Sequence, residues 1–293
     1  MLQLAVFLFL CVVWGTTWVG IKMTLEGFPP FLGAAARFAV AILALFAYTR
    51  WTGVSLRVKR RDFLAISVSA FLMYTLDYGL VYWGEQHLSA GVTSIFFATF
   101  PLFTGVWSNF LFRQEPFRWH KFSGLVLGFV GVVVVFYDQL LATQFSHLVV
   151  LATLAIISGA AGGAMAVIIV KKYLAHLHPI SLSFHQMLQG IFFLGMFGIL
   201  LEHSAAIHFN ARVGLALLYL GLIGSALAFT LYYWLLQHMS PITLSLIIYI
   251  TPLVALLVDY LVYREVVALR TVLGMLIIFA GITLTEAERY RHR

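Results

Sequence analysis

Charged side chains are scarce in this sequence. Asp, Glu, Lys and Arg make up 10% of the residues, whereas hydrophobic residues make up 62% and the mean hydropathy is +0.98. Soluble domains carry about 25% charged residues, so the composition excludes that class and predicts an integral membrane protein in a lipid bilayer. The net charge of +7 comes without a basic face or an RNA-binding signature. We therefore expect no nucleic-acid partner.

Cysteine and catalytic motifs are also nearly absent. The single cysteine, Cys11, has no partner for an internal disulfide bond. The sequence contains none of the patterns G-x-x-x-x-G-K-[ST], H-E-x-x-H and G-x-S-x-G. We expect no enzyme activity, no built-in ATP motor and no cofactor. His176 and His178 are a possible metal pair, but two ligands on one short loop are a weak signal, and we expect no metal there.

Long polar loops are missing, and most of the chain lies in apolar stretches. A helix needs about 20 mainly apolar residues to cross a bilayer. Backbone groups in lipid must be satisfied within the segment, so we expect each stretch to be helical. Ten stretches qualify, at residues 3–24, 31–49, 63–83, 90–112, 118–137, 147–170, 179–201, 212–236, 241–263 and 269–287.

The sequence contains an internal repeat. Residues 82–89 (YWGEQHLS) and 233–240 (YWLLQHMS) match at five of eight positions, 151 residues apart. Further matched pairs, at offsets of 149 to 151, are Lys22 with Lys171, Ser94 with Ser245, Pro101 with Pro252, Glu115 with Glu265, Gly124 with Gly274 and Gly131 with Gly281. We predict two repeats of five helices, at residues 1–140 and 147–293.

The distribution of lysine and arginine orients these helices. With a cytoplasmic N-terminus, inner segments hold thirteen basic residues: Arg50, Arg57, Lys59, Arg60, Arg61, Arg113, Arg118, Lys121, Lys171, Lys172, Arg289, Arg291 and Arg293. Outer loops hold Arg212, Arg264 and Arg270. We expect both termini in the cytoplasm. Since five helices per repeat is an odd number, the second repeat is inverted, as in alternating-access carriers that bind substrate near the midplane.

Several motifs together resemble the EamA repeat of the drug/metabolite transporter superfamily. They are Trp14-Gly15 with Lys22, Arg37, the proline of the fourth stretch followed by an acidic turn, and the glycines of the fifth. The resemblance covers both halves and implies ten helices and the export or exchange of small metabolites. The aromatic content also resembles the YddG-type aromatic amino acid exporters. The second half departs from the pattern, with Gln186 in place of Arg37 and Gly163-Ala164 in place of Trp14-Gly15.

Two charges are expected inside the membrane. Arg37 and Asp77 each lie about 10 Å below the outer end of a predicted helix. Intramembrane charges are costly and are functional candidates by default. We predict a possible gate or ion pair. A purely orienting pair, or an Arg37 side chain that reaches the interface, fits the sequence equally well.

Aromatic and hydroxyl side chains supply the other candidates. Tyr74, Tyr78 and Tyr82 share one helical face, and rings near the midplane bind aromatic or cationic groups or simply pack helices. Pro101 and Pro252 are each expected to break a predicted helix. Broken helices often border transport sites, although a purely structural kink explains the two prolines equally well. His185 and Gln189 are too polar for lipid, and either proton coupling or an interhelical hydrogen bond accounts for them. The predicted substrate-binding residues are Trp18, Tyr78, Tyr82, Ser94, Phe97, Phe100, His185, Gln189, Ser245 and Tyr249.

From these features we predict a carrier in the plasma membrane, the inner membrane in a bacterium. It exports small metabolites, with aromatic or other hydrophobic amino acids favoured, through a central cavity by alternating access. The alternatives are an exporter of cationic drugs or other metabolites, a membrane-embedded enzyme and a scaffold. The coupling ion and the oligomeric state stay open at this point.

Overall fold

The chain is helical wherever the structure describes it. The computed structural model describes residues 1–112, 119–144, 146–202, 206–251, 253–254 and 269–291. Within these ranges every regular element is a helix, and eight helices are long and apolar enough to cross a membrane. Two shorter apolar helices, Trp119–Val135 and Pro241–Thr251, accompany them. The prediction of an all-α protein with apolar helices of membrane-spanning length is therefore confirmed for this part of the chain.

The described helices overlap the predicted stretches, and residues 252 and 255–263 of the stretch at 241–263 lie outside the described residues. In the first half they are α1 (Leu2–Leu25), α2 (Pro30–Thr52), α3 (Arg60–Ala70) with η1 (Phe71–Asp77) and α4 (Tyr78–Glu85), α5 (Ala90–Phe97) with α6 (Phe100–Phe112), and α7 (Trp119–Val135), followed by the short α8 (Tyr137–Ala142). In the second half they are α9 (His147–Ile169) with η2 (Val170–Leu174), α10 (Pro179–Leu201), α11 (Ala211–Gly221) with η3 (Leu222–Leu227) and α12 (Ala228–His238), α13 (Pro241–Ser245) and α15 (Leu269–Arg291). The predictions for Glu115, Pro252, Arg264 and Glu265 lie outside the described residues.

Local sequence signals explain where several helices begin. Proline occupies the first position of α2, α10 and α13, where its missing N–H costs no hydrogen bond. The side chains of Ser89, Ser146, Asn210 and Ser240 accept hydrogen bonds from the first turns of α5, α9, α11 and α13. α2 ends at Thr52 and is capped by Gly53, whose φ of 73° is the left-handed conformation that glycine adopts without strain.

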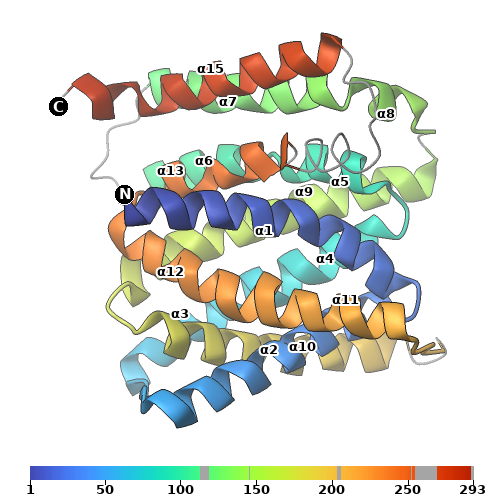
Figure 1. The fold of residues 1–293 in the computed structure, drawn as a ribbon, viewed down its shortest axis with the longest axis vertical. Coiled ribbons are helices and arrows are strands. Elements are labelled where there is room, and N and C mark those ends of the chain that lie inside the picture. Colours follow the sequence, from blue (N-terminus) through green and yellow to red (C-terminus); the bar gives the residue numbers. More distant parts are fainter. Residues whose placement is uncertain (113–118, 145, 203–205, 252, 255–268, 292–293) are drawn as a thin grey trace.

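Helices from the two halves of the sequence pack against each other. α1 lies against α11 and α12, and α9 lies against η1 and α4. α2 lies against α10, and α7 lies beside α15 at one edge of the molecule (Figure 1). Each of these contacts joins an element of the first half to one of the second. The interior of the molecule is therefore built from both halves of the sequence.

Two helices contain π-helical segments at matching positions. η1 begins at Phe71 and η3 begins at Leu222, and these residues are 151 positions apart. A π turn inserts an extra residue into a helix and is frequent at functional sites. η1 ends at Asp77 and is followed directly by Tyr78, the first residue of α4. The repeated π segment therefore sets the direction of two of the candidate side chains.

The fourth membrane helix is interrupted near its proline. α5 ends at Phe97 and α6 begins at Phe100, one residue before Pro101. Proline has no N–H for an intrahelical bond and its ring crowds the preceding turn. The helix therefore breaks on the N-terminal side of Pro101, and Phe97 and Phe100 lie on either side of the break.

Two lysines cap helix ends in the same way in the two halves. The Lys22 ammonium group of α1 donates a hydrogen bond to the carbonyl oxygen of Glu85, the last residue of α4. The Lys171 ammonium group of η2 donates to the carbonyl oxygen of Leu236 in α12 at 2.6 Å. The last carbonyl groups of a helix lack intrahelical partners. Each lysine thus stabilises the end of a helix that lies across from its own.

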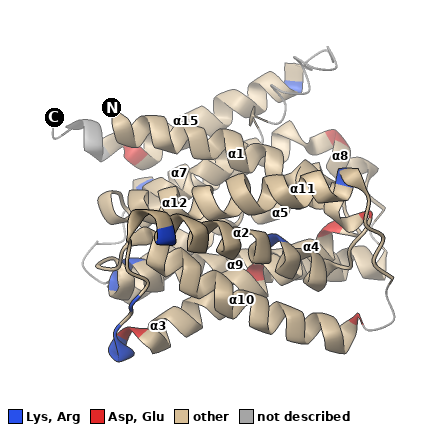
Figure 2. Ribbon diagram, turned by 60° about the horizontal axis from the view of Figure 1, so that its bottom comes forward, with Lys and Arg blue, Asp and Glu red and all other residues tan. Residues whose placement is uncertain are grey.

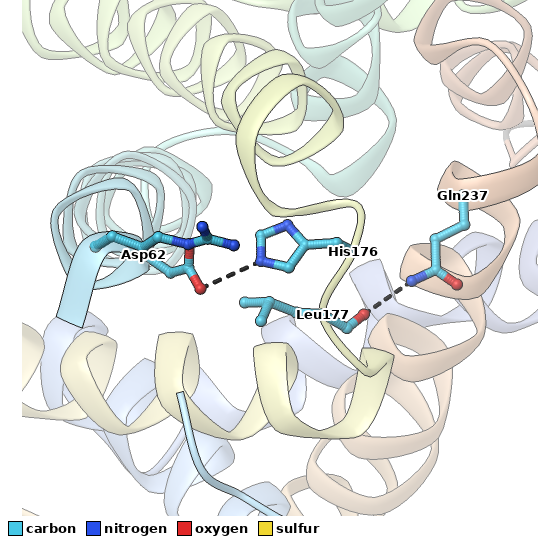
Figure 3. A network of polar contacts seen from close by, with 5 residues as sticks. Asp62, His176, Leu177 and Gln237 are labelled. Atoms are coloured by element: carbon cyan, nitrogen blue, oxygen red, sulfur yellow. Dashed lines mark hydrogen bonds and ion pairs between the residues drawn. The ribbon is translucent and has the colours of Figure 1, made fainter. Parts of the chain in front are cut away.

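A polar network joins the halves at one end of the molecule (Figure 3). The Asp62 carboxylate of α3 lies 3.2 Å from Nε2 of His176, in the turn before α10. The Gln237 amide of α12 donates to the carbonyl oxygen of Leu177 in the same turn at 2.8 Å. His178 caps the first turn of α10. The two histidines thus face different partners, and no cluster of three or more metal-binding side chains occurs among the described residues.

Charged side chains lie mostly at helix ends and in the connecting segments (Figure 2). Arg37 and Asp77 are exceptions, since they lie within helices and are only 1% and 3% exposed. α1 begins and α15 ends on the same side of the bundle (Figure 1). Placing both chain ends on one face of a membrane is therefore compatible with the arrangement of the helices.

Candidate functional site

A cavity of about 80 Å³ lies at the centre, between the two halves. Its walls come from α1, α2, η1, α4, α5, α6, α12 and the helix that begins at Pro241. The lining residues are Trp14, Thr17, Trp18, Ile21, Arg37, Met73, Asp77, Tyr78, Val81, Phe97, Phe100, Phe229, Tyr232, Leu244, Ser245, Ile247, Ile248 and Thr251.

Aromatic rings form much of the wall. The centroid of the Tyr78 ring lies 5.0 Å from that of Phe38 and 6.0 Å from that of Phe229. The Trp18 and Phe97 centroids are 5.5 Å apart. Ring pairs in such edge-on and tilted arrangements contribute about 0.5–1.5 kcal/mol beyond their buried area. The rings therefore hold each other in place, and the wall is suited to a flat apolar group.

Arg37 connects the two halves at this cavity. Its Nε donates a hydrogen bond to Ser225 Oγ at 2.7 Å and its Nη2 donates to the carbonyl oxygen of Gly224 at 3.0 Å, both in η3. The guanidinium group also lies over the Tyr78 ring, 4.9 Å from the centroid, as a cation–π contact. This contact and the two hydrogen bonds hold the positive charge at the edge of the cavity.

Asp77 lies on the same cavity but is not joined to Arg37. Its carboxyl group packs against Gly159 and Gly163 of α9, where a β-carbon would approach Asp77 oxygen atoms to 3.3 Å or less. The sequence hypothesis of an Arg37–Asp77 pair is not realised in the described contacts, because the guanidinium group reaches η3 instead. The hypothesis used depth alone, and depth does not determine the direction in which a side chain points.

The small residue at position 163 explains one departure from the repeat. The first half has Trp14 where the second has Gly163, and the first has Asp77 where the second has Ala228. Gly163 gives room to the Asp77 carboxyl group. Trp14 instead extends to α12, with its ring centroid 5.5 Å from that of Phe229. The asymmetry therefore places an acid on one side of the cavity and an indole on the other.

Several of the predicted site residues line this cavity. They are Trp18, Arg37, Asp77, Tyr78, Phe97, Phe100 and Ser245. The sequence analysis did not select Tyr232, Ile248 and other residues of the second half as substrate contacts. The repeat offset was the missed signal, since adding 151 to Tyr78, Val81, Phe97 and Phe100 gives Phe229, Tyr232, Ile248 and Thr251, all of which line the cavity.

Ser94 and Tyr249 lie outside the cavity wall. Ser94 Oγ donates to the carbonyl oxygen of Gly91 in its own helix at 2.7 Å. The Tyr249 hydroxyl donates to the carbonyl oxygen of Leu125 at 2.7 Å, and its ring fills the space beside Gly128 of α7. Both side chains therefore have structural hydrogen-bond partners, and neither lines the cavity.

His185, Gln189 and Tyr82 also lie elsewhere. Nε2 of His185 donates to the carbonyl oxygen of Leu56, in the segment between α2 and α3, at 2.6 Å. Gln189 is partly buried on α10. Tyr82 is fully buried in α4 but is not part of the cavity wall. His185 is therefore hydrogen-bonded, but its partner is a loop carbonyl and not a second helix as the interhelical alternative expected.

Comparison with known proteins places the chain in a family. The model of the EamA-like transporter family matches residues 1–137 and 150–286. The chain is 25% identical to the uncharacterized transporter YoaV of Bacillus subtilis (strain 168) over 94% of this chain and 95% of that protein. It is 28% identical to the uncharacterized transporter YvbV of the same strain, with 96% and 90% covered, and 24% identical to protein PagO of Salmonella typhimurium, with 97% and 92% covered.

The chain is similar in fold to a solved crystal structure. It has a TM-score of 0.81 and 17% identity, and the match covers 99% of this chain and 98% of that chain. The resemblance inferred from Trp14, Lys22, Arg37 and the glycines is thus confirmed across both halves. The protein is a multi-pass membrane transporter for a small molecule, and it belongs to the EamA-like transporter family of the drug/metabolite transporter superfamily.

Proposed function

We propose that this protein exports amino acids, with those bearing aromatic or other hydrophobic side chains favoured. Ten helices form two inverted repeats, both termini are cytoplasmic, and the substrate crosses by alternating access through the central cavity. In a bacterium the protein resides in the inner membrane. The observation that carries this proposal is the cavity itself, which combines aromatic rings with one acid and one base.

The two charges match the two ends of a zwitterion. Arg37 and Asp77 both line the cavity, come from different helices and are not paired with each other in the described contacts. A guanidinium group binds carboxylates and a carboxylate binds ammonium groups. An amino acid offers both groups, and its side chain then meets the rings. A purely cationic drug uses Asp77 and the rings but meets repulsion from Arg37, so we favour the amino acid.

The cavity has to enlarge during transport. About 80 Å³ is well below the roughly 300–1,000 Å³ typical of sites for drug-sized ligands. An amino acid with an aromatic side chain therefore enters only when the halves separate at one end. Alternating access requires a closed state between two open states, and a small central cavity is what such a closed state would contain.

The test is transport by the purified protein in lipid vesicles. Uptake of labelled phenylalanine, leucine and lysine and of an aromatic quaternary ammonium ion is measured at equal concentrations. We expect phenylalanine to be transported fastest, leucine more slowly and the two cations least. Preference for the quaternary ammonium ion over phenylalanine would contradict the proposal and favour a cationic-drug exporter.

Tyr78→Ala should reduce phenylalanine transport more than alanine transport. The Tyr78 ring lines the cavity and is held by Phe38 and Phe229. Loss of one stacking ring removes about 0.5–1.5 kcal/mol, or about 2- to 10-fold in kcat/KM for an aromatic substrate. Trp83→Ala is the control, because Trp83 packs near Leu88 away from the cavity. An unchanged ratio of phenylalanine to alanine transport in Tyr78→Ala would contradict the aromatic site.

The orientation has a separate test by cysteine labelling in intact cells. Cys11→Ser provides the background, and Ser55→Cys and Ile207→Cys each introduce one thiol at a position exposed in the structure. We expect an impermeant maleimide to label Ile207→Cys but not Ser55→Cys, because the segment around Ser55 is rich in basic residues. The opposite labelling pattern would reverse the proposed topology.

A further inference from the structure

Glu85 is a buried acid that the proposed substrate site does not use. It is the last residue of α4 and its side chain is fully buried. Neither carboxyl oxygen has a hydrogen-bond partner among the described residues. Buried polar atoms are nearly always hydrogen-bonded in proteins. A fully buried carboxyl group with two unpartnered oxygen atoms therefore suggests a position that takes up a proton during function.

The repeat shows that this carboxyl group is not needed for the local structure. The equivalent of Glu85 in the second half is Leu236. Lys22 caps the Glu85 backbone carbonyl and Lys171 caps that of Leu236, so the lysine cap forms with or without an acid. Leu236 is also buried, at 1% exposure. The carboxyl group of Glu85 is thus an addition to a structural unit that is complete without it.

The surroundings of Glu85 determine which form of the acid is stable. The cations that act on it are Lys22 of α1 and Arg37 of α2. Both already donate hydrogen bonds to other oxygen atoms. α5 carries no ionisable side chain, and α9 carries only His147 at its first position. An ionised carboxylate without hydrogen bonds is very costly in an apolar interior, and the closed structure offers the Glu85 carboxyl oxygens no such bonds among the described residues.

Glu85 is also aligned with the cavity. Asp77, Val81 and Glu85 follow each other at four-residue intervals and so share one face of their helix. Asp77 and Val81 line the cavity, and Glu85 lies one turn beyond, about 6 Å further along the helix axis. Tyr78 and Tyr82 directly follow Asp77 and Val81 in the same helix. Glu85 therefore lies one turn from the cavity wall without being part of it, so opening of the cavity toward this end of the helix would bring water to its carboxyl group without substrate contact.

We propose that Glu85 binds the proton that couples this transporter to a proton gradient. The carboxylate takes up a proton when its end of the molecule opens to solution, and the neutral acid stays protonated while the cavity is closed. It releases the proton to water in the cavity once the opposite end opens, and no other bond forms or breaks. This inference rests on the proposed transport function and adds its energy source, an exchange of protons for substrate.

The experiment measures accumulation of phenylalanine in vesicles whose lumen is one pH unit more acidic than the medium, with the membrane potential clamped at zero. One proton exchanged per zwitterion supports an accumulation of about tenfold per pH unit. We expect about tenfold accumulation by the unaltered protein. Glu85→Gln should equilibrate phenylalanine without accumulating it, and should retain exchange of phenylalanine across the membrane in the absence of a pH difference.

Two further variants separate this role from a structural one. Glu85→Leu copies the second half, so it should fold and behave as Glu85→Gln does. Glu26→Gln changes an exposed acid that pairs with Arg212, and it should accumulate phenylalanine as the unaltered protein does. Accumulation by Glu85→Gln would overturn the proposal. Equilibration without accumulation by the unaltered protein would also overturn it, while leaving the proposed transport function intact.

An infrared measurement does not depend on the substrate. The purified protein in detergent at neutral pH should show a carbonyl band of a protonated carboxylic acid that is missing in Glu85→Gln. If the spectra are identical, Glu85 does not hold a proton and the inference is wrong. If phenylalanine does not cross at all, the proposed amino acid export is wrong, and the infrared band alone decides whether Glu85 binds a proton.

Discussion

Gly281→Ala is expected to destabilise the protein by about 1–3 kcal/mol, the usual cost of forcing extra atoms into a packed interior. Gly281 lies on α15, where a β-carbon would come within 2.5 Å of the Gly128 nitrogen and 2.6 Å of the Gly124 carbonyl oxygen of α7. These are backbone atoms, so no side-chain rotation relieves the clash. The two helices have to move apart along their whole contact.

The matching contact at the other end of this helix pair reinforces the expectation. A β-carbon on Gly131 would come within 2.7 Å of the Ile278 nitrogen and 2.9 Å of the Gly274 carbonyl oxygen. The offset of 150 relates Gly124 to Gly274 and Gly131 to Gly281. Each repeat therefore supplies the same two glycines, and the glycines of one repeat face those of the other.

Gly195→Ala is the matched control for this substitution. Gly195 is also within a long helix, α10, and a β-carbon there meets no atom within 4 Å. Alanine is a better helix former than glycine by about 1 kcal/mol, so this variant should be as stable as the original protein or more so. Thermal unfolding in detergent, followed by gel filtration, compares the two variants. Equal stability of Gly281→Ala and Gly195→Ala would contradict the close α7–α15 contact.

The sequence predicted the helices because the bilayer imposes a simple rule on them. A run of about 20 apolar residues has to be helical in lipid, so the stretches at 3–24 and 179–201 coincide closely with α1 and α10. The repeat offset pairs Gly124 with Gly274 and Gly131 with Gly281, but the sequence does not show what these glycines contact. The structure assigns Gly124 and Gly281 to an internal contact, which depends on distant parts of the chain.

The site was predicted less completely, because a residue's depth says nothing about its direction around the helix axis. Ser245 and Tyr249 are neighbours on one helix, yet Ser245 lines the cavity and Tyr249 packs against α7. The π segment before Asp77 changes the helical phase, which a pattern with a fixed period does not reveal. The sequence selected Arg37 as part of a possible gate or ion pair, but its partners in η3 depend on the packing of α2 on the second half.

Asp77→Asn is expected to lower kcat/KM for phenylalanine by about 10- to 100-fold, because a buried hydrogen bond to a charged group contributes about 1.5–3 kcal/mol. In the proposed complex Asp77 binds the substrate ammonium group and Arg37 binds the carboxylate. Asparagine keeps the size and the hydrogen-bonding oxygen but loses the charge. Since the carboxyl group packs against Gly159 and Gly163, the substitution should fit without displacing α9.

The chemical readout is discrimination between phenylalanine and 3-phenylpropionate, which lacks the ammonium group. The unaltered protein should strongly prefer phenylalanine, and Asp77→Asn should lose most of this preference, because only the phenylalanine rate depends on the acid. Asp62→Asn is the control, since Asp62 is also a buried aspartate but bonds His176 at one end of the molecule, away from the cavity. It should leave the ratio of the two rates unchanged. If Asp77→Asn keeps the original ratio, Asp77 does not bind the ammonium group, and the zwitterion model of the cavity fails while membership of the transporter family is unaffected.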